Sequence, residues 1–347
     1  MELFVSGRLC LFGEHSDWAG QYRKVDPQIE PGLAIAVGTN QGISARVAVD
    51  NNLKFKSTQC DRVLELPMTE DCLLNLAQTN HFYSYVAGTA YQALTRYRVG
   101  GLAIDNYWMD LPLQKGLSSS AAICVLVSRA FNQLYNLGLS TAEETELAYW
   151  GERTTPSQCG RLDGACAYGK QPILMRFDGD RCDIEPLTVA NDLHLIIVDL
   201  AGYKDTQKIL AELNQCYPAA EGSTAAKVRE YLGSLNQNLV QQAAMAMQEG
   251  NAMKIGALMN QAQAKFDRYV APACSQLQAP LLHRLLQHPP LQPYVHGGKG
   301  VGSQGDGTAQ FIARDRASQM QAIAVIQRDF PDMKCYQLDI PQTQAAV

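Results

Sequence analysis

The sequence predicts an α+β protein of two domains. Its 347 residues exceed what one hydrophobic core usually serves. Strand-like and helix-like segments are mixed along the chain, and we find neither internal repeats nor low-complexity tracts. With 46% hydrophobic and 18% charged residues, the chain can readily bury a core. We place the domain boundary near residue 186, which gives domains over 1–185 and 186–347.

The first third of the chain reads as strands and turns, followed by a helix. Residues 2–15 are rich in β-forming side chains and are broken by Gly7 and Gly13. Residues 34–50 form two β-prone runs around the turn "GTNQG". A helix is predicted over about residues 80–98, because apolar side chains recur there at helical spacing: Phe82, Val86, Ala90, Ala93 and Tyr97.

A strand over 101–114 leads into the serine-rich stretch "LQKGLSSSAA". Behind the serines, one apolar face predicts a helix of about five turns, carried by Ala122, Val125, Leu126, Ala130 and Leu134. A second helix follows, with Thr141 and Glu144 in the spacing of a capping box. Residues 164–187 then resemble a β-hairpin pair.

The second domain begins with "LHLIIVDLA", a near-continuous apolar strand that fits burial on both faces or at a domain junction. Lys204 and Asp205 follow this strand, in a loop that we expect to be exposed. The remaining predicted elements are two long helical stretches near 224–249 and 251–270, a glycine-rich segment, a helix around 316–329 and a strand at 335–340.

Charge and cysteine content favour a cytoplasmic protein that binds a small molecule. The formal net charge of -5 gives no electrostatic reason to expect nucleic acid or an anionic membrane as partner. The ten cysteines form no CxxC pair and no zinc-type cluster, which indicates a reducing compartment. We find neither a signal peptide nor an apolar run of membrane-spanning length. We therefore predict a cytoplasmic monomer or homodimer.

The serine-rich stretch can be interpreted in two ways. The backbone N–H groups at a helix N-terminus and the helix dipole attract anions, so "KGLSSSAA" could cradle a phosphate group. Alternatively, it is an ordinary serine cap with small residues packed around it. "GVGSQG" at 300–305 does not decide between them: a β-like segment follows it, so it fails the dinucleotide-binding pattern. The chain also lacks a P-loop.

Three motifs together resemble those of the GHMP kinases, named for galactokinase, homoserine kinase, mevalonate kinase and phosphomevalonate kinase. "GRLCLFGEHSDWAG" (7–20) is similar to the first motif in its galactokinase-like form, "PLQKGLSSSAA" (112–122) to the second and "KGVGSQGDG" (299–307) to the third. They stand in the family's order and span nearly the whole chain. The resemblance implies the two-domain GHMP kinase fold, with an N-terminal domain like domain 2 of ribosomal protein S5 and a C-terminal ferredoxin-like α/β sandwich.

The resemblance also implies that ATP and Mg²⁺ are cofactors, with ATP donating its γ-phosphoryl group to a small-molecule hydroxyl. The implied ATP-binding residues are Lys115, Gly116, Leu117, Ser118, Ser119, Ser120 and Ala121. Ser120 would also reach the metal, and Glu152 would be its carboxylate ligand. The alternative for Glu152 is a solvated position on its helix.

The catalytic candidates are Asp163 and Arg8. Asp163, in "CGRLDGACAYG", resembles the base of galactokinase-like members and would accept the proton of the acceptor hydroxyl. Arg8 would keep that carboxylate ionised and stabilise charge on the transferring phosphoryl group. Without the resemblance, "LDG" would be interpreted as a turn.

The implied acceptor is a monosaccharide, phosphorylated on its anomeric hydroxyl. Glu14, His15 and Asp17 would bind its hydroxyls, and "GEHSD" as a unit is typical of the sugar kinases of the family. A metal site at these residues is the weaker alternative.

The chain departs from galactokinase in "WAGQYRKVDPQIEPG", at Gly164 and in "LAGYKDTQ", so another aldose, an amino sugar or a uronic acid stays open. A mevalonate or homoserine kinase and a non-catalytic sugar and ATP sensor are the competing hypotheses.

Overall fold

The computed structural model describes residues 1–347 except 59, 80, 112–115, 158 and 344–347. The chain folds into two compact units: unit 1 contains Met1–Arg8 and Gly38–Gly169, and unit 2 contains Leu9–Val37 and Lys170–Val347. The N-terminal segment therefore contributes to both units. The division at residue 186 made from the sequence stays a prediction.

Unit 1 is built on a sheet whose strands run in the order β4 (Cys60–Pro67), β3 (Asn52–Ser57), β5 (Gly101–Met109) and β2 (Gly32–Asp50). β1 (Glu2–Phe12) pairs with β2. Residues Ile43–Asp50 of β2 run antiparallel to β5, whereas β3 and β5 are parallel. The predicted β-rich character of this part of the chain is thus confirmed.

The glycines interpreted as strand breaks in unit 1 are close-packing positions instead. β1 continues through Gly7, and β2 is one strand of 19 residues rather than two runs around a turn. A Cβ at Gly7 would lie 2.4 Å from Leu111 Cδ1 and 2.9 Å from the Leu117 carbonyl oxygen. A Cβ at Gly42 would lie 2.4 Å from the carbonyl oxygen of Val5. Glycine is needed at both positions because neighbouring chain segments approach so closely.

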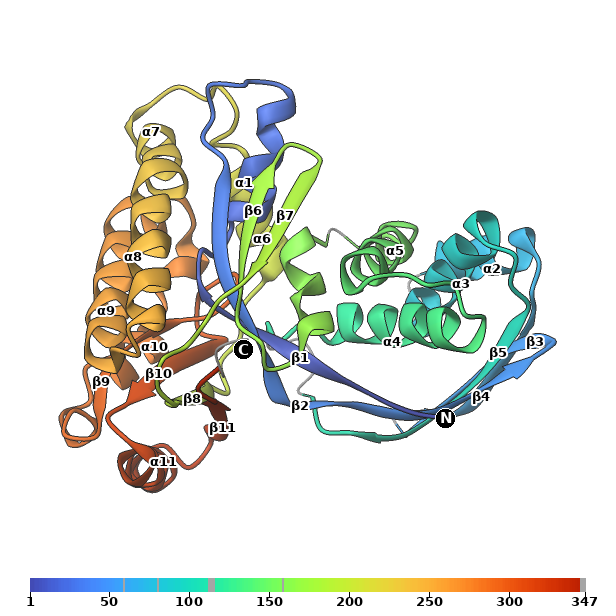
Figure 1. Cartoon of the computed structure of the whole chain (residues 1–347). Helices are drawn as coiled ribbons and strands as arrows, with labels where there is room; N and C mark the ends of the chain where they lie inside the picture. Colours follow the sequence, from blue (N-terminus) through green and yellow to red (C-terminus); the bar gives the residue numbers. More distant parts are fainter. Residues whose placement is uncertain (59, 80, 112–115, 158, 344–347) are drawn as a thin grey trace. The chain divides into compact units, whose positions relative to one another are not determined.

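Helices cover one face of the unit 1 sheet (Figure 1). They are α2 (Glu70–Ala77), α3 (Ser84–Arg96), α4 (Ser119–Leu134) and α5 (Thr141–Arg153), followed by a 3₁₀ helix at Arg161–Tyr168. The apolar face predicted behind the serines is buried in α4, including Ala122, Val125 and Leu126.

The capping box of α5 lies one residue earlier than predicted. Ser140 has extended backbone angles, its hydroxyl accepts from the Glu143 N–H, and the Glu143 carboxylate accepts from the Ser140 N–H. Thr141 is therefore the first helical residue rather than the cap. Glu144 is buried instead and forms an ion pair with Arg129.

Unit 2 contains a β-hairpin and a four-stranded antiparallel sheet. The hairpin consists of β6 (Ile173–Asp178) and β7 (Arg181–Pro186), and β6 pairs with the first residues of β2. This hairpin is the one expected within residues 164–187, although the first part of that stretch, up to Tyr168, is the 3₁₀ helix. The four-stranded sheet has the order β11 (Lys334–Ile340), β8 (Leu193–Asp199), β10 (Thr308–Ala313) and β9 (Val295–Gly300).

The helices of unit 2 complete its core. They are α1 (Ser16–Gln21), α6 (Thr206–Asn214), α7 (Ser223–Glu230), α8 (Asn236–Gln248), α9 (Ala252–Tyr269), α10 (Pro280–Leu286) and α11 (Arg316–Asp329). A π-helical turn at Tyr231–Leu235, distorted at Gly233, divides the helix predicted over 224–249. Short 3₁₀ turns occupy Tyr22–Lys24, Ala271–Ala273, Ser275–Gln278 and Pro289–Leu291.

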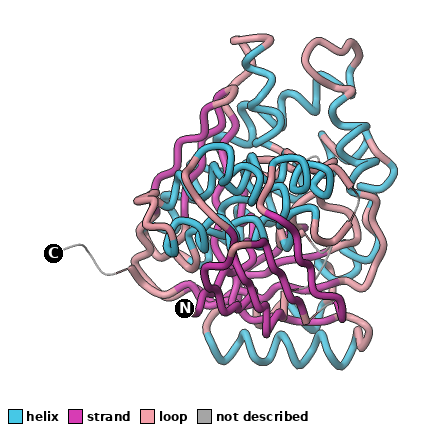
Figure 2. Tube along the Cα trace, turned by 90° about the vertical axis from the view of Figure 1, so that its right-hand side faces the viewer, coloured by secondary structure: helices cyan, strands magenta, loops and turns pink. Residues whose placement is uncertain are grey.

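The predicted α+β class is confirmed, and Figure 2 shows both kinds of secondary structure along the trace. Ile196 and Val198 of β8, Phe311 of β10 and Ile326 of α11 belong to one buried apolar cluster of unit 2. Among the described residues, no helix has the length and apolar character needed to cross a membrane.

Candidate active site

Arg8 and Asp163 form the centre of the candidate site in unit 1. Arg8 lies on β1 and its guanidinium forms an ion pair with the carboxylate of Asp163, in the 3₁₀ helix Arg161–Tyr168. The side chain of Arg8 is 8% exposed and that of Asp163 is 26% exposed. Arg8 also donates through Nη1 to the Gly116 carbonyl at 2.8 Å, and its backbone N–H donates to the Leu117 carbonyl at 3.1 Å. One arginine therefore joins the candidate base to the loop that precedes α4.

Ser118 is at the N-cap position of α4 but does not cap the helix. Its backbone is left-handed, with φ 58°, and its side chain makes no capping hydrogen bond. The hydroxyl donates to Asp163 instead. The simple capping interpretation therefore does not describe this serine, because its hydroxyl does not bond the first N–H groups of α4, which are the groups that can bind an anion.

The other predicted ATP-binding residues lie around the same helix start. Leu117 and Ala121 are buried, Gly116 has φ 74°, and Ser119 and Ser120 are the first two residues of α4. Lys115 lies outside the described residues.

Glu152 lies near the end of α5 with its side chain buried, so it is not the solvated helix residue of the alternative interpretation. Ser120 forms a hydrogen bond to its carboxylate, and the Ser157 hydroxyl donates to Oε1 at 3.3 Å. Burial, and then the negative charge of Asp163, raise the pKa of Glu152 to about 7. The charge of Asp163 therefore acts on Glu152, and the Arg8 cation, which is paired with Asp163, opposes this shift.

The oxygen donors at this point fit a magnesium ion. Mg²⁺ is usually held by one or two carboxylates together with phosphate oxygens and water. Glu152 and the Ser120 hydroxyl would supply the protein ligands, and a bound cation would favour the ionised form of Glu152 against the burial and the Asp163 charge that raise its pKa. Within the described part of the chain, no group of three or more His, Cys, Asp or Glu side chains is arranged to hold a metal by itself. Mg²⁺ in proteins commonly completes its coordination with phosphate oxygens and water, so two protein ligands would be enough here.

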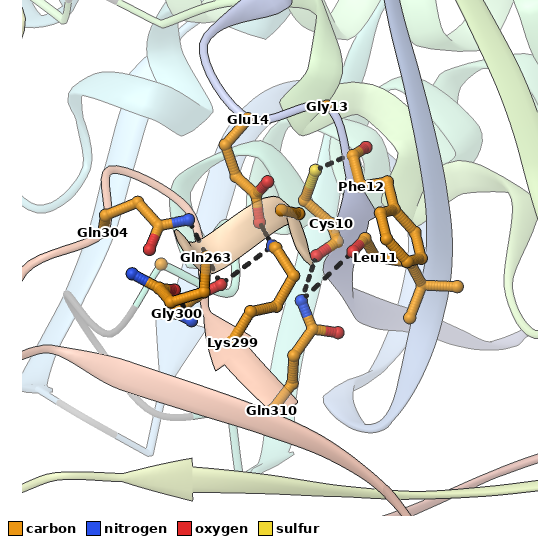
Figure 3. A network of polar contacts seen from close by, with 12 residues as sticks. Cys10, Leu11, Phe12, Gly13, Glu14, Gln263, Lys299, Gly300, Gln304 and Gln310 are labelled. Atoms are coloured by element: carbon orange, nitrogen blue, oxygen red, sulfur yellow. Dashed lines mark hydrogen bonds and ion pairs between the residues drawn. The ribbon is translucent and has the colours of Figure 1, made fainter. Parts of the chain in front are cut away.

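In unit 2, Glu14 forms a buried ion pair with Lys299. Glu14 follows β1, Lys299 lies on β9, and their side chains are 4% and 1% exposed. The Lys299 ammonium donates to the Glu14 carboxylate and, at 2.9 Å, to the Gly300 carbonyl (Figure 3). Sequence reasoning did not single out Lys299; the available signal was one lysine inside the glycine-rich "GGKGVG".

Three buried glutamines extend this network along the glycine-rich segment (Figure 3). Gln263 of α9 accepts from the Gly300 N–H at 2.8 Å, and Gln304 donates to the Gly300 carbonyl at 3.3 Å. Gln310 of β10 donates to the Cys10 carbonyl at 2.8 Å. The third motif is therefore bound to α9 through Gln263 and, through Lys299, to Glu14 in the loop after β1.

His15 and Asp17 are both buried at the start of α1. His15 has a left-handed backbone with φ 69°, and its ring stacks on Phe266 at a centroid distance of 6.1 Å. Its Nδ1 atom accepts a hydrogen bond of 3.1 Å from the indole N–H of Trp18, a residue that sequence reasoning did not select. Burial lowers the pKa of His15 to about 4; the Ser303 carbonyl opposes this shift, and the nearby ammonium groups of Lys204 and Lys299 reinforce it. The imidazole is therefore neutral at physiological pH.

The loop after β8 is more structured than an exposed loop. Asp205 caps α6 by accepting from the Lys208 N–H at 3.0 Å. The half-buried Lys204 side chain passes so close to Gly307 that a Cβ there would lie 2.5 Å from Lys204 Cε. Lys204 thus packs against the glycine-rich segment.

Gly164, one of the departures from galactokinase, has a local packing cause. A Cβ at this position would lie 2.4 Å from Thr145 Cγ2. A larger side chain here would require Thr145 of α5 to move.

Comparison with known proteins agrees with this geometry. Residues 84–170 match the family model of the GHMP kinases N terminal domain. This segment is similar to a GHMP kinase N-terminal domain. It contains the start of α4, Glu152 and Asp163.

Relatives with similar sequences include galactokinases. The chain is 27% identical to galactokinase of Thermococcus kodakarensis over 300 residues, which are 80% of this chain and 81% of that protein. It is also 27% identical to galactokinase of Pyrococcus furiosus, but that match spans 55% of this chain and only 50% of the relative. For several such relatives, the chain therefore matches about half of their length.

Solved structures show the fold. The chain superimposes on Lactococcus lactis galactokinase complexed with galactose with a TM-score of 0.72 and 18% identity, covering 100% of this chain and 95% of that one. Streptococcus pneumoniae phosphomevalonate kinase in complex with phosphomevalonate and AMPPNP gives a TM-score of 0.73 and 17% identity, covering 98% and 100%. The chain has the GHMP kinase fold, and both the predicted resemblance and the predicted fold are confirmed.

The structure brings the predicted residues together in two groups. Arg8, Ser118, Ser120, Glu152 and Asp163 are linked within unit 1. Glu14, His15 and Asp17 gather within unit 2, together with the unpredicted Lys299 and Trp18. The chemical roles assigned to these residues from the sequence stay predictions.

Proposed function

We propose that the protein is an ATP-dependent kinase that transfers the γ-phosphoryl group to the anomeric hydroxyl of a monosaccharide. The observation that carries the proposal is the Arg8–Asp163 pair, bonded through Arg8 and Ser118 to the start of α4. The GHMP kinase domain, the similarity to galactokinases and the fold shared with an AMPPNP-bound kinase support this choice.

In unit 1, Asp163 would act as the base. Its carboxylate accepts the proton of the acceptor hydroxyl as the new oxygen–phosphorus bond forms and the bond to the β-phosphate oxygen breaks, releasing ADP. Arg8 holds Asp163 in place and offers positive charge to the transferring phosphoryl group. The N-terminus of α4, with Gly116, Ser119 and the backbone around them, would hold the phosphates.

Mg²⁺, when bound with ATP, neutralises charge on the phosphate oxygens. Ser120 and Glu152 would hold it, and the carboxylate of Glu152 would then be ionised despite its burial. Ser157 keeps that carboxylate oriented through its hydrogen bond to Oε1.

In unit 2, His15 and Asp17 would contact the sugar. A neutral imidazole and a carboxylate provide the donor and the acceptor that adjacent hydroxyls require. Glu14, with its carboxylate bound by Lys299, would contribute mainly by fixing the loop on which His15 lies. A cytoplasmic location and a monomeric or homodimeric state belong to the same proposal.

A coupled ADP-release screen tests the function directly. The panel contains neutral aldoses, uronic acids, acetylated amino sugars, mevalonate and homoserine, each with ATP and with and without Mg²⁺; NMR then locates the product phosphate. We expect Mg²⁺-dependent turnover of one or a few free monosaccharides to sugar 1-phosphates. Turnover of mevalonate or homoserine alone would refute the sugar assignment, and sugar and ATP binding without turnover would favour the sensor.

A further inference from the structure

Trp18 is positioned to control the chemistry of His15. It lies in α1, within the stretch that departs from galactokinase, and its indole N–H donates to His15 Nδ1 at 3.1 Å. The two rings are nearly perpendicular, at 74°. Tyr217 packs against Trp18 with its centroid at 5.4 Å, and Tyr22 lies at 6.5 Å. The indole is therefore held in place by aromatic side chains while its N–H points at one ring nitrogen.

This hydrogen bond determines which nitrogen of His15 carries the proton. The indole N–H can only donate, so Nδ1 must accept with its lone pair. A neutral imidazole has a single N–H, which must then be on Nε2. The environment of His15 keeps the ring neutral, because the side chain is 5% exposed and the ammonium groups of Lys204 and Lys299 are nearby.

The Nε2 atom is buried, and no described residue reaches it with hydrogen-bond geometry. The Ser303 backbone carbonyl lies near the ring and acts to raise its pKa, without meeting hydrogen-bond geometry at Nε2. A buried donor without a partner is unfavourable, and so is the left-handed backbone of His15 at φ 69°. Such features persist where a ligand makes use of them.

We propose that Trp18 is a positioning residue for acceptor recognition, which holds His15 as the Nε2–H tautomer so that Nε2–H donates to an oxygen of the sugar. This inference rests on the proposed function, because it assigns the sugar to His15. It also limits the contact, because His15 can only donate a hydrogen bond to the sugar. The sugar oxygen at Nε2 must therefore accept, and a hydroxyl there must donate its own hydrogen to another group.

NMR of ¹⁵N-labelled protein tests the tautomer without any substrate. We expect His15 in the free wild-type protein to show a protonated Nε2 and an unprotonated Nδ1. In Trp18→Phe, which keeps an aromatic ring but removes the donor, we expect a mixture of tautomers. A wild-type His15 protonated on Nδ1 would overturn the proposal. This spectrum needs no sugar. The tautomer of His15 can therefore be determined even if the activity screen refutes the proposed kinase function.

A double-mutant cycle tests the role in recognition, using the sugar turned over in the screen, with D-galactose and D-glucuronate as first probes. We expect Trp18→Phe to raise the sugar KM about ten-fold, which is the usual effect of one lost hydrogen bond, and to leave the KM for ATP within about two-fold. His15→Gln keeps an amide donor near the Nε2 position and has no tautomers. In that background, Trp18→Phe should change the sugar KM less than about two-fold.

The outcome separates positioning from packing. If Trp18 acts only by packing on Tyr217 and Tyr22, Trp18→Phe will raise the sugar KM equally in both backgrounds, which would overturn the proposal. Trp108→Phe is the matched control, because Trp108 is 59% exposed and lies in unit 1. We expect that control to leave both KM values and the His15 spectrum unchanged.

Discussion

The two units each contain a carboxylate paired with a cation, and the two pairs differ in their contact with solvent. In unit 1, Asp163 is 26% exposed and its Arg8 partner 8%. In unit 2, Glu14 and Lys299 are 4% and 1% exposed and are surrounded by buried glutamines. A carboxylate with access to solvent can meet a substrate and take up its proton, whereas a fully enclosed pair is held by its surroundings. The difference suggests that the first pair serves chemistry and the second serves the geometry of the loop that carries His15.

Burial explains why the two pairs respond differently to mutation. Removing one partner of an enclosed ion pair leaves the other charge without water or a counter-charge, which destabilises the fold strongly. Asp163 keeps some solvent contact and also accepts a hydrogen bond from Ser118, so its replacement by a neutral isostere should be tolerated by the fold. Four predictions test this contrast.

The largest expected effect is the loss of turnover in Asp163→Asn. Asparagine has almost the same shape but cannot accept the proton of the acceptor hydroxyl, so kcat should fall by about 10²–10⁴-fold. The melting temperature and the affinity for ATP should remain close to those of the wild type, as measured by calorimetry and titration. Asp105→Asn, which alters a partly exposed pair with Lys56 in the same unit, is the control and should keep full activity. Retention of most activity by Asp163→Asn would remove Asp163 as the base.

The second effect is the loss of stability in Lys299→Met. Glu14 would be left buried without its cation, and we expect the free energy of unfolding to fall by about 3–5 kcal/mol in denaturant titrations. The double variant with Glu14→Gln removes both charges and should recover much of this loss. Lys56→Met breaks an exposed pair and should have little effect. A Lys299→Met protein as stable as the wild type would contradict the buried pair.

The same contrast explains what the sequence could and could not predict. Arg8, Ser118 and Asp163 lie in motifs, so the resemblance located them without any knowledge of their contacts. The Lys299 and Glu14 pair joins residues 285 positions apart in the sequence, and no local pattern encodes such a contact.

The secondary structure shows the same difference between local patterns and long-range contacts. A helix is expected around residues 316–329, where α11 lies, whereas Gly7 and Gly42 are interpreted as breaks or turns although they are close-packing positions between strands. Local patterns therefore predict helices, strands and motifs. They do not predict long-range contacts, in which a glycine can serve close packing instead of a turn.

The third prediction is a pH dependence of stability that results from the burial of His15. Its pKa is lowered from 6.5 to about 4, so between these pH values the native state binds fewer protons than the unfolded state. The stabilising contribution is therefore complete above pH 6.5 and is lost as the pH falls toward 4, by up to about 3 kcal/mol in the unfolding free energy. Denaturant titrations at pH 7 and pH 5 should show this loss in the wild type and a smaller loss in His15→Gln. An equal pH dependence in both proteins would show that His15 is not enclosed as described.

The smallest effect is expected for Ser120→Ala. This variant tests whether a polar residue of unit 1 can be removed with an effect on Mg²⁺-dependent turnover but little effect on stability. The Ser120 hydroxyl is bonded to the Glu152 carboxylate and would also meet the metal, so its removal should raise the Mg²⁺ concentration for half-maximal turnover about ten-fold. Because Glu152 keeps its bond to Ser157, the melting temperature should change little. Thr79→Ala, which removes an exposed hydroxyl after α2, is the control for the assay. If Ser120→Ala lowered the stability while the Mg²⁺ dependence stayed unchanged, Ser120 would be a structural residue, and the contrast between the two units would not extend beyond Arg8 and Asp163.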